Sequence, residues 1–258
     1  GLTNGEAVQI VDTRAYDGTH TVTRVDADTL RLDGVKWQPG AAMGLEQLSQ
    51  RRRGVVFDGV DDVVEVSLRE PTTEISHELW FRTADPDAGL FAAVAGPLGA
   101  RGHDRHIYLR GGNIGVRVHG GEVLGAGGPS LADDRWHHVA HVMGASVGGQ
   151  RLYVDGVEVA EGSRSESAFD WQDTLLFGFS NDGAHAFLRG QLAEVRVWGK
   201  ARTAAEIRRD MFLPLTGREA ELLGLWHLGA ILGDRPGTAV DASLYLRHGV
   251  VQGGAHVA

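Results

Sequence analysis

The sequence predicts an all-β protein: a sandwich or jelly roll of short strands, with a small β-meander before it and one short helix near the C-terminal side. Strand signals rich in valine, leucine and aromatic residues recur at short intervals between residues 54 and 198, separated by Gly- and Asp-rich breaks. Glycine, which weakens helices and serves tight turns, occurs 37 times. With 258 residues, of which 42% are hydrophobic, the chain can bury one large core. One sandwich with a small appendage therefore fits better than two equal domains.

The N-terminal part is predicted to be a three-stranded meander between residues 8 and 32, because apolar residues there are separated by two Asp-containing turn signals. A unit of about 25 residues is too small to be stable alone, so we expect it to pack on something else. Residues 38–53, which carry Pro39, Gly40 and Gly44, are predicted to be a linker. We assign residues 1–45 to a meander or connector and residues 54–258 to the jelly-roll domain.

The segment GVVFDGVDDVVEV at residues 54–66 predicts two short strands joined by an acidic corner. Asp58, Asp61 and Asp62 fall within five residues of one another. A calcium loop is one interpretation, because hard cations take oxygen ligands. A solvated turn, in which Asp and Gly supply the backbone geometry, is the other, and the spacing alone favours the turn.

Ten strands are predicted in the sandwich. Leu79 and Phe81 should face one side of their strand and Trp80 the other, because side chains alternate along a strand. On the last strand Glu194 and Arg196 share a face, which is typical of a solvated charge pair. The predicted strands cover residues 63–66, 77–82, 89–94, 106–110, 113–119, 136–143, 150–154, 157–162, 174–179 and 191–198.

One helix is predicted at residues 203–210. Thr203 is the expected N-cap and Glu206 follows three residues later, which is the spacing of a capping box. Ala204, Ile207 and Met211 then share one face. This face should close against the sandwich.

Composition excludes several classes of partner and chemistry. A net charge of −9 argues against nucleic acid and anionic membrane surfaces, which would repel the protein. No apolar run is long enough to span a bilayer. The absence of cysteine excludes disulfides and thiolate chemistry. The chain begins at Gly1 without a methionine, so we expect a processed or excised piece of a longer protein. A secreted or cell-surface location is expected from the functional hypothesis given below.

Five motifs then carry a family resemblance: residues 55–66, 78–82, 135–140, 152–156 and 190–198. In this order they resemble the bacterial laminin-G-like domains of the concanavalin A-like lectin/glucanase superfamily. The resemblance covers residue 54 to the C-terminus and implies a concanavalin A-like jelly roll. It also suggests that the C-terminal segment, with strands near residues 222–228 and 248–251, returns to pair beside the first strand. A detached segment would instead begin a truncated second repeat.

The resemblance also bears on calcium. Relatives often carry a calcium ion and frequently have an aspartate where this chain has Ala193, so the obvious side-chain ligand is missing. Asp61, Asp62 and Asp182 remain as candidate oxygen donors for calcium, the one cofactor that the sequence suggests.

Catalytic patterns are absent from the sequence. A glycan-cleaving relative would present alternating carboxylates on one strand, and no such strand is found. No serine lies in a G-x-S-x-G elbow. We therefore predict that the protein is not an enzyme.

A polar rim built from three loops is the predicted binding site, because Gly, Asn, Asp and His offer adaptable polar contacts. The loops cover residues 85–89, 102–106 and 180–185. The candidate ligand-binding residues are Asp85, Asp87, His103, Asp104, Arg105, His106, Asn181, Asp182 and His185.

The leading functional hypothesis is a non-catalytic recognition module that binds a glycan or a surface protein as part of a larger secreted or surface assembly. The alternative is a structural component of a phage-tail-like or injection particle, which would form a homo-oligomer or larger assembly. Glycoside hydrolysis is a third hypothesis. The sequence does not separate the first two, since neither needs catalytic residues.

Overall fold

The computed structural model describes residues 7–10, 18–24, 30–32, 53–100, 102–120, 123–228 and 237–257. The chain divides into two compact units, Gly1–Arg51 and Arg52–Ala258. In the first unit, β1 (Ala7–Ile10), β2 (Gly18–Arg24) and β3 (Leu30–Leu32) form an antiparallel sheet in the order β1-β2-β3. The predicted meander is confirmed. The predicted linker lies, apart from Arg53, outside the described residues, and the assignment of a connector role remains a proposal.

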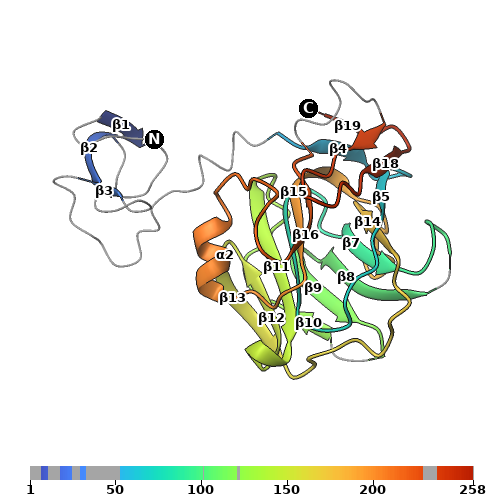
Figure 1. The fold of residues 1–258 in the computed structure, drawn as a ribbon. Coiled ribbons are helices and arrows are strands. Elements are labelled where there is room, and N and C mark those ends of the chain that lie inside the picture. The colour runs from blue at the N-terminus through green and yellow to red at the C-terminus, as the bar shows by residue number, and fades with distance from the viewer. Residues whose placement is uncertain are drawn as a thin grey trace. The chain divides into compact units, whose positions relative to one another are not determined.

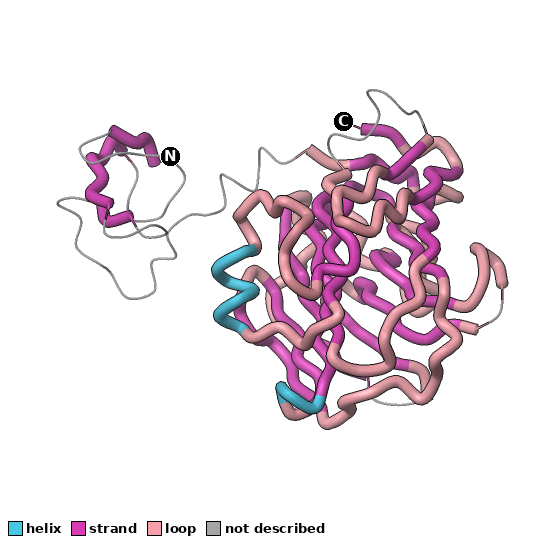
Figure 2. Tube along the Cα trace, in the orientation of Figure 1, coloured by secondary structure: helices cyan, strands magenta, loops and turns pink. Residues whose placement is uncertain are grey.

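The second unit is a β-sandwich of two antiparallel sheets (Figures 1 and 2). The first sheet has the order β10 (Val123–Gly125), β9 (Asn113–Val118), β8 (His103–Arg110), β7 (Gly89–Val94), β14 (Thr174–Phe177), β5 (Val63–Ser67), β18 (Gly249–Gln252) and β17 (Thr238–Ala239). The second has the order β13 (Val157–Gly162), β12 (Gly149–Val154), β11 (Trp136–Gly144), β6 (Ile75–Thr83), β15 (Arg189–Trp198), β4 (Val55–Asp58) and β19 (His256–Val257), with β16 (Leu222–Trp226) also paired to β15. Each of the ten predicted sandwich strands corresponds to one of these.

The main core lies between the two sheets and takes one face of each. Leu79 and Phe81 of β6 point into it, whereas Trp80 packs on the opposite face with Trp136. The predicted alternation along β6 is therefore confirmed. Trp226 and Phe177 meet edge to face at 5.1 Å in this core. Trp226 is fully buried, so the C-terminal part of the chain belongs to the same core.

Helix α2 (Ala204–Asp210) covers the outer face of the second sheet. The Thr203 side chain accepts a hydrogen bond from the Glu206 amide and the Glu206 carboxylate accepts one from the Thr203 amide, so the predicted capping box is confirmed. Ile207 packs in a cluster with Ala140 and Tyr153 of the strands beneath it. A 3₁₀ turn, η1 (Ala145–Val147), follows β11. Within the described residues, no helix has the length and apolar character needed to cross a lipid bilayer.

The C-terminal segment closes the sandwich. Strand β18 pairs with β5 and β19 pairs with β4, the first strand of this unit, as predicted. The connection before β18 is organised by Asp241, which is fully buried. Its carboxylate accepts hydrogen bonds from the amides of Leu225, Ser243 and Arg247. Residues 222–228 are attached to β15 through β16, so they complete this sandwich rather than begin a second repeat.

The predicted loop at residues 102–106 is wrong. These residues, from His103 onward, form the first half of β8, which pairs with β7 and β9. The polar sequence of residues 103–106 suggested a loop. It forms a strand because its charged side chains have buried partners on both faces of the sheet. Asp104 receives hydrogen bonds from Ser167 and Gln172, and Arg105 pairs with Glu70.

Candidate functional site

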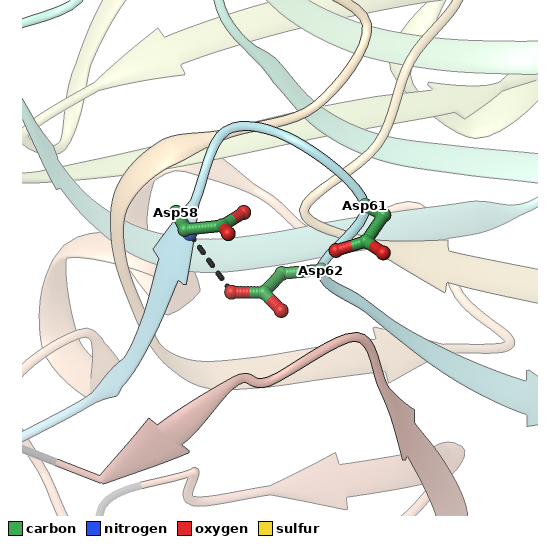
Figure 3. Close-up of side chains that lie close together, drawn as sticks. All are labelled: Asp58, Asp61 and Asp62. Atoms are coloured by element: carbon green, nitrogen blue, oxygen red, sulfur yellow. Dashed lines mark hydrogen bonds between the residues drawn. The ribbon is translucent and has the colours of Figure 1, made fainter.

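The acidic corner after β4 brings Asp58, Asp61 and Asp62 together, with one carboxylate oxygen of each within 4.8 Å of the others (Figure 3). The Asp58 amide donates to Asp62 Oδ2 at 2.8 Å, and the Gly254 amide donates to Asp62 Oδ1. The Val60 amide donates to Asp58 Oδ1 at 2.7 Å. The buried Asp62 therefore fastens the turn to the C-terminal strand connection.

This donor set fits calcium poorly as it stands. Three of the six carboxylate oxygens already accept backbone amides, and calcium takes six to eight oxygen ligands. Asp182, the third candidate ligand, does not join the cluster, because its carboxylate pairs with Arg117. Ala193 is buried with Trp80 and Trp136, in an apolar cluster. The acidic corner is explained by the hydrogen bonds that its carboxylate oxygens accept within the turn.

The three segments predicted as a rim do approach one another. His185 Nδ1 lies 2.9 Å from Asp85 Oδ2, and this hydrogen bond, together with the negative charge of Asp85, raises the pKa of the exposed His185. Asp87 Oδ1 accepts the Gly111 amide at 3.0 Å. Asp85 and His185 line a cleft of about 740 Å³, which Arg82, Asp134 and Arg189 also line. Its charged residues are already paired in part, as Arg82 and Asp134 form a two-point ion pair.

A second cleft, of about 580 Å³, lies over β8 and β9 on the outer face of the first sheet. We call it the Trp171 groove and define it by its lining residues: Gly102, His103, Arg117, His119, Gly120, Trp171 and Asn181. An aromatic row forms one wall, in which the ring centroids of Trp171 and Phe169 lie 4.8 Å apart and those of Phe169 and His119 lie 5.1 Å apart. Gly102 allows the close approach of Trp171, because a Cβ there would lie 3.3 Å from the indole ring.

The polar side of the Trp171 groove is built from paired charges and buried histidines. Arg117 Nε donates to Asp182 Oδ2 at 2.5 Å. His106, the cross-strand neighbour of Arg117 on β8, is fully buried, and its Nδ1 lies 3.0 Å from Ser180 Oγ. Burial, followed by the positive charge of Arg117, lowers the pKa of both His103 and His106. The groove thus combines an aromatic wall with a fixed set of hydrogen-bonding groups.

The predicted site residues separate into three groups. His103 and Asn181 line the Trp171 groove, and Asp182 holds Arg117 beside it. Asp85 and His185 line the cleft of about 740 Å³, while Asp87 accepts a hydrogen bond from the Gly111 amide. The remaining predicted residues, Asp104, Arg105 and His106, have buried side chains; those of Asp104 and Arg105 are occupied by protein partners and cannot contact a surface ligand in this arrangement.

Four lining residues were not predicted from the sequence: Arg117, His119, Gly120 and Trp171. Arg117 was hidden because it lies within an ordinary strand, β9. A signal for Trp171 did exist, since Phe169 and Trp171 alternate with Asp170 and Gln172 in a segment without strand character. Half-exposed aromatic residues in such a connection are typical of binding surfaces.

Comparison with known proteins agrees with this architecture. The family model of the concanavalin A-like lectin/glucanases superfamily matches residues 58–208, which is more than half of the chain. The chain belongs to this superfamily. Solved structures of similar fold include a Bacteroides ovatus protein provisionally described as carbohydrate binding, with a TM-score of 0.60 and 17% identity over 99% of this chain and 81% of that one. No curated protein sequence matches this superfamily member.

A second structural neighbour of this concanavalin A-like chain is the heptameric SAP-like pentraxin of Limulus polyphemus. It has a TM-score of 0.53 and 14% identity over 80% of this chain and 94% of the pentraxin. At these identities both neighbours bear on the fold alone.

Proposed function

We propose that the protein is a non-catalytic recognition module that binds a glycan in the Trp171 groove. The observation that carries this proposal is the combination, in one cleft, of the Trp171 wall with the polar groups of His103, Arg117 and Asn181. An aromatic ring offers an apolar surface to the C–H face of a sugar, while convergent polar groups fix its hydroxyls. The similarity in fold to a protein provisionally described as carbohydrate binding supports the proposal.

The non-catalytic assignment is supported by the state of the buried carboxylates. Glycoside hydrolysis needs two carboxyl groups that flank one bond, with one of them able to hold a proton. Glu70 and Glu78 are instead bound by arginine and histidine, and their pKa values are lowered: burial opposes ionisation, but these partners outweigh it. Asp62 and Asp241 are bound by backbone amides. The hydrogen bonds and ion pairs of these four carboxylates stabilise the fold, and this accounts for their burial without a catalytic role.

Replacing Trp171 by alanine is expected to weaken glycan binding about thirtyfold, because an aromatic residue at the centre of a binding site can contribute about 2 kcal/mol. His103→Ala should weaken it less. Binding is measured first on a glycan array and then by calorimetry with the best ligand. Tyr245→Ala is the matched control, because Tyr245 is an exposed aromatic outside the groove lining. Full affinity in the Trp171→Ala variant would place the glycan elsewhere, with the Asp85–His185 cleft as the next site to test.

Calcium binding at Asp61 and Asp62 remains a prediction of the resemblance, and the hydrogen bonds of the acidic corner lead us to expect no structural ion. The melting temperature should therefore be unchanged between a chelator and millimolar calcium, since a ligand that binds the folded state raises it. The measurement is thermal unfolding followed by circular dichroism. A rise that disappears in Asp61→Asn, which changes the one corner residue without a backbone hydrogen bond among those described, would establish a calcium site.

The secreted or surface location and the larger assembly remain proposals. The competing structural role, in a particle without a small ligand, predicts self-association. A heptameric pentraxin shares the fold, so oligomers are compatible with this architecture. Gel filtration at micromolar concentration separates the two hypotheses, because a self-assembling component should elute as an oligomer.

A further inference from the structure

The charge of the Trp171 groove differs from that of the chain. The protein carries a net charge of −9, yet neither aspartate nor glutamate occurs among the described residues that line this groove. The titratable groups among these described residues are Arg117, His103 and His119, which are neutral or positive at every pH. The other cleft, in contrast, is lined by Asp58, Asp85 and Asp134 as well as by cations. The contrast favours a ligand that brings the negative charge which these lining residues lack.

Arg117 is held in one orientation. Its Nε donates to Asp182 Oδ2, and Asp182 is in turn positioned by its own amide, which donates to Ser180 Oγ at 3.2 Å, and by Arg110, which donates to its carbonyl. Among the described residues, neither Nη atom of Arg117 has a hydrogen-bond partner. Two fixed N–H-bearing nitrogens thus remain for a ligand. A guanidinium group that is oriented in advance loses little entropy when it binds a carboxylate or a sulfate.

Two buried imidazole nitrogens lie close to this guanidinium. His103 Nδ1 and His106 Nε2 are both buried without a hydrogen-bond partner, and the two rings lie 5.4 Å apart. Asp182 is the opposing charge in this region, with Oδ2 3.8 Å from His106 Nδ1, and it is already paired with Arg117. An anionic group of a ligand would be stabilised by the charge of Arg117. Protonation of His103 or His106 would add a further positive charge beside it. A neutral sugar would use only part of this arrangement, because hydrogen bonds to an ionised group are about twice as strong as neutral ones.

We propose that the Trp171 groove selects a sugar that carries a carboxylate or sulfate group, with Arg117 as the residue that binds the anion. This inference rests on the proposed glycan-binding function and specifies its ligand class. Trp171 contacts the ring of the sugar and Arg117 receives the charged substituent. Asp182 acts as a positioning residue, because it orients Arg117 through Nε.

The test uses the full chain on an array that holds neutral, uronic acid-containing, sialylated and sulfated glycans. We expect the anionic glycans to bind at least about tenfold more tightly than neutral glycans of the same length. Binding should weaken with added salt. The carboxylated and sulfated classes separate the two sources of charge. Equal affinity for neutral and anionic glycans, or a preference for neutral ones, would overturn the inference and leave the proposed function intact, whereas binding of no glycan would overturn both.

Variants of Arg117 complete the test. Arg117→Gln should lose about tenfold in affinity for the anionic ligand and a smaller factor for neutral glycans, which lose only a hydrogen bond to a hydroxyl, and Arg117→Lys should recover part of the loss through its charge. Arg208→Gln is the matched control, because Arg208 is exposed on α2, which covers the other sheet, and its replacement changes the net charge equally. Melting temperatures establish that each variant is folded. An unchanged preference for anions in folded Arg117→Gln would overturn the role of this residue.

Discussion

Replacing Glu78 by glutamine is expected to lower the free energy of unfolding by about 3 kcal/mol. Glu78 is fully buried on β6 beneath α2, where Arg202 Nη1 donates to it at 2.5 Å. Arg196 and His138 lie 3.7 and 3.4 Å from its second oxygen. Burial opposes its ionisation, but the close approach of His138 and the charges of its partners outweigh burial and lower the pKa to about 2. A shift of this size corresponds to roughly 3 kcal/mol at neutral pH.

The cost has a clear physical origin. Removal of the charge leaves two buried guanidinium groups with less compensation, and breaking a buried pair commonly costs about 3–5 kcal/mol. The lower end applies here because Asp210 still pairs with Arg202 and Glu194 still pairs with Arg196. Because Arg202 also binds the Glu206 carbonyl, the same change should loosen α2 from the sheet.

The measurement is urea unfolding at pH 7, with the fluorescence of the buried tryptophans as the probe. Glu158→Gln is the matched control, because Glu158 is exposed on edge strand β13 and its nearest cation, Arg151, is 3.8 Å away. Exposed pairs of this kind contribute about 1 kcal/mol or less. Equal unfolding midpoints for the two variants would show that the Glu78 network does not support the fold.

This network also shows what the sequence did not predict. Glu194 and Arg196 share a face of β15, and the alternation there suggested a solvated pair. In the structure β15 bulges at Glu194, whose φ is +53°, and Arg196 is buried under the segment that follows α2. Arg196 donates to the carbonyls of Asp210 and Leu213. The alternation of residues within one strand does not indicate which later segment of the chain will cover that strand. The burial of Arg196 could therefore not be predicted from the sequence of β15.

The fold was predictable because its signals are local. Strand alternation in β6, the capping box at Thr203 and the closing strand of the C-terminal segment all follow from short patterns or from the family motifs, and all are confirmed. The site was less accessible, because it is defined by long-range packing. The three rim segments do converge, but the groove takes Arg117 from a neighbouring strand and Trp171 from a distant connection. Polar composition alone placed Asp104 and Arg105 in a loop, although the sheet buries both.

Acidification from pH 6.5 to pH 4.5 is expected to destabilise the protein strongly. His141 is fully buried in the core face of β11, where its Nε2 bonds to Gln150, and burial followed by the charge of His77 lowers its pKa to about 3. Burial also lowers the pKa values of His106 and His138, and for His138 the nearby Glu78 carboxylate opposes part of this shift. The unfolded chain, with a histidine pKa near 6.5, therefore binds more protons than the folded chain below that pH.

The sign and the window follow from these shifts. Each histidine that stays neutral in the fold costs about 1.4 kcal/mol of stability for each pH unit below 6.5, so His141 alone removes roughly 3 kcal/mol by pH 4.5. His137 and His185 have raised pKa values, and their contribution is fully present below pH 6.5 and lost as the pH rises through the folded values. They therefore do not offset the loss within this window. Carboxyl groups whose pKa is lowered in the fold, such as Glu78, cause a further loss of stability only below about pH 4.5.

Urea unfolding at half-unit pH intervals gives the slope of the unfolding free energy against pH. His141→Gln should reduce that slope between pH 6.5 and 4.5 by close to one proton, because the group that must be charged on unfolding is gone. His256→Gln, which removes an exposed imidazole on β19, is the matched control. A flat profile in the parent protein would contradict the neutral burial of these histidines. A steep profile that His141→Gln leaves unchanged would assign the effect to the histidines of the other networks, His106 and His138.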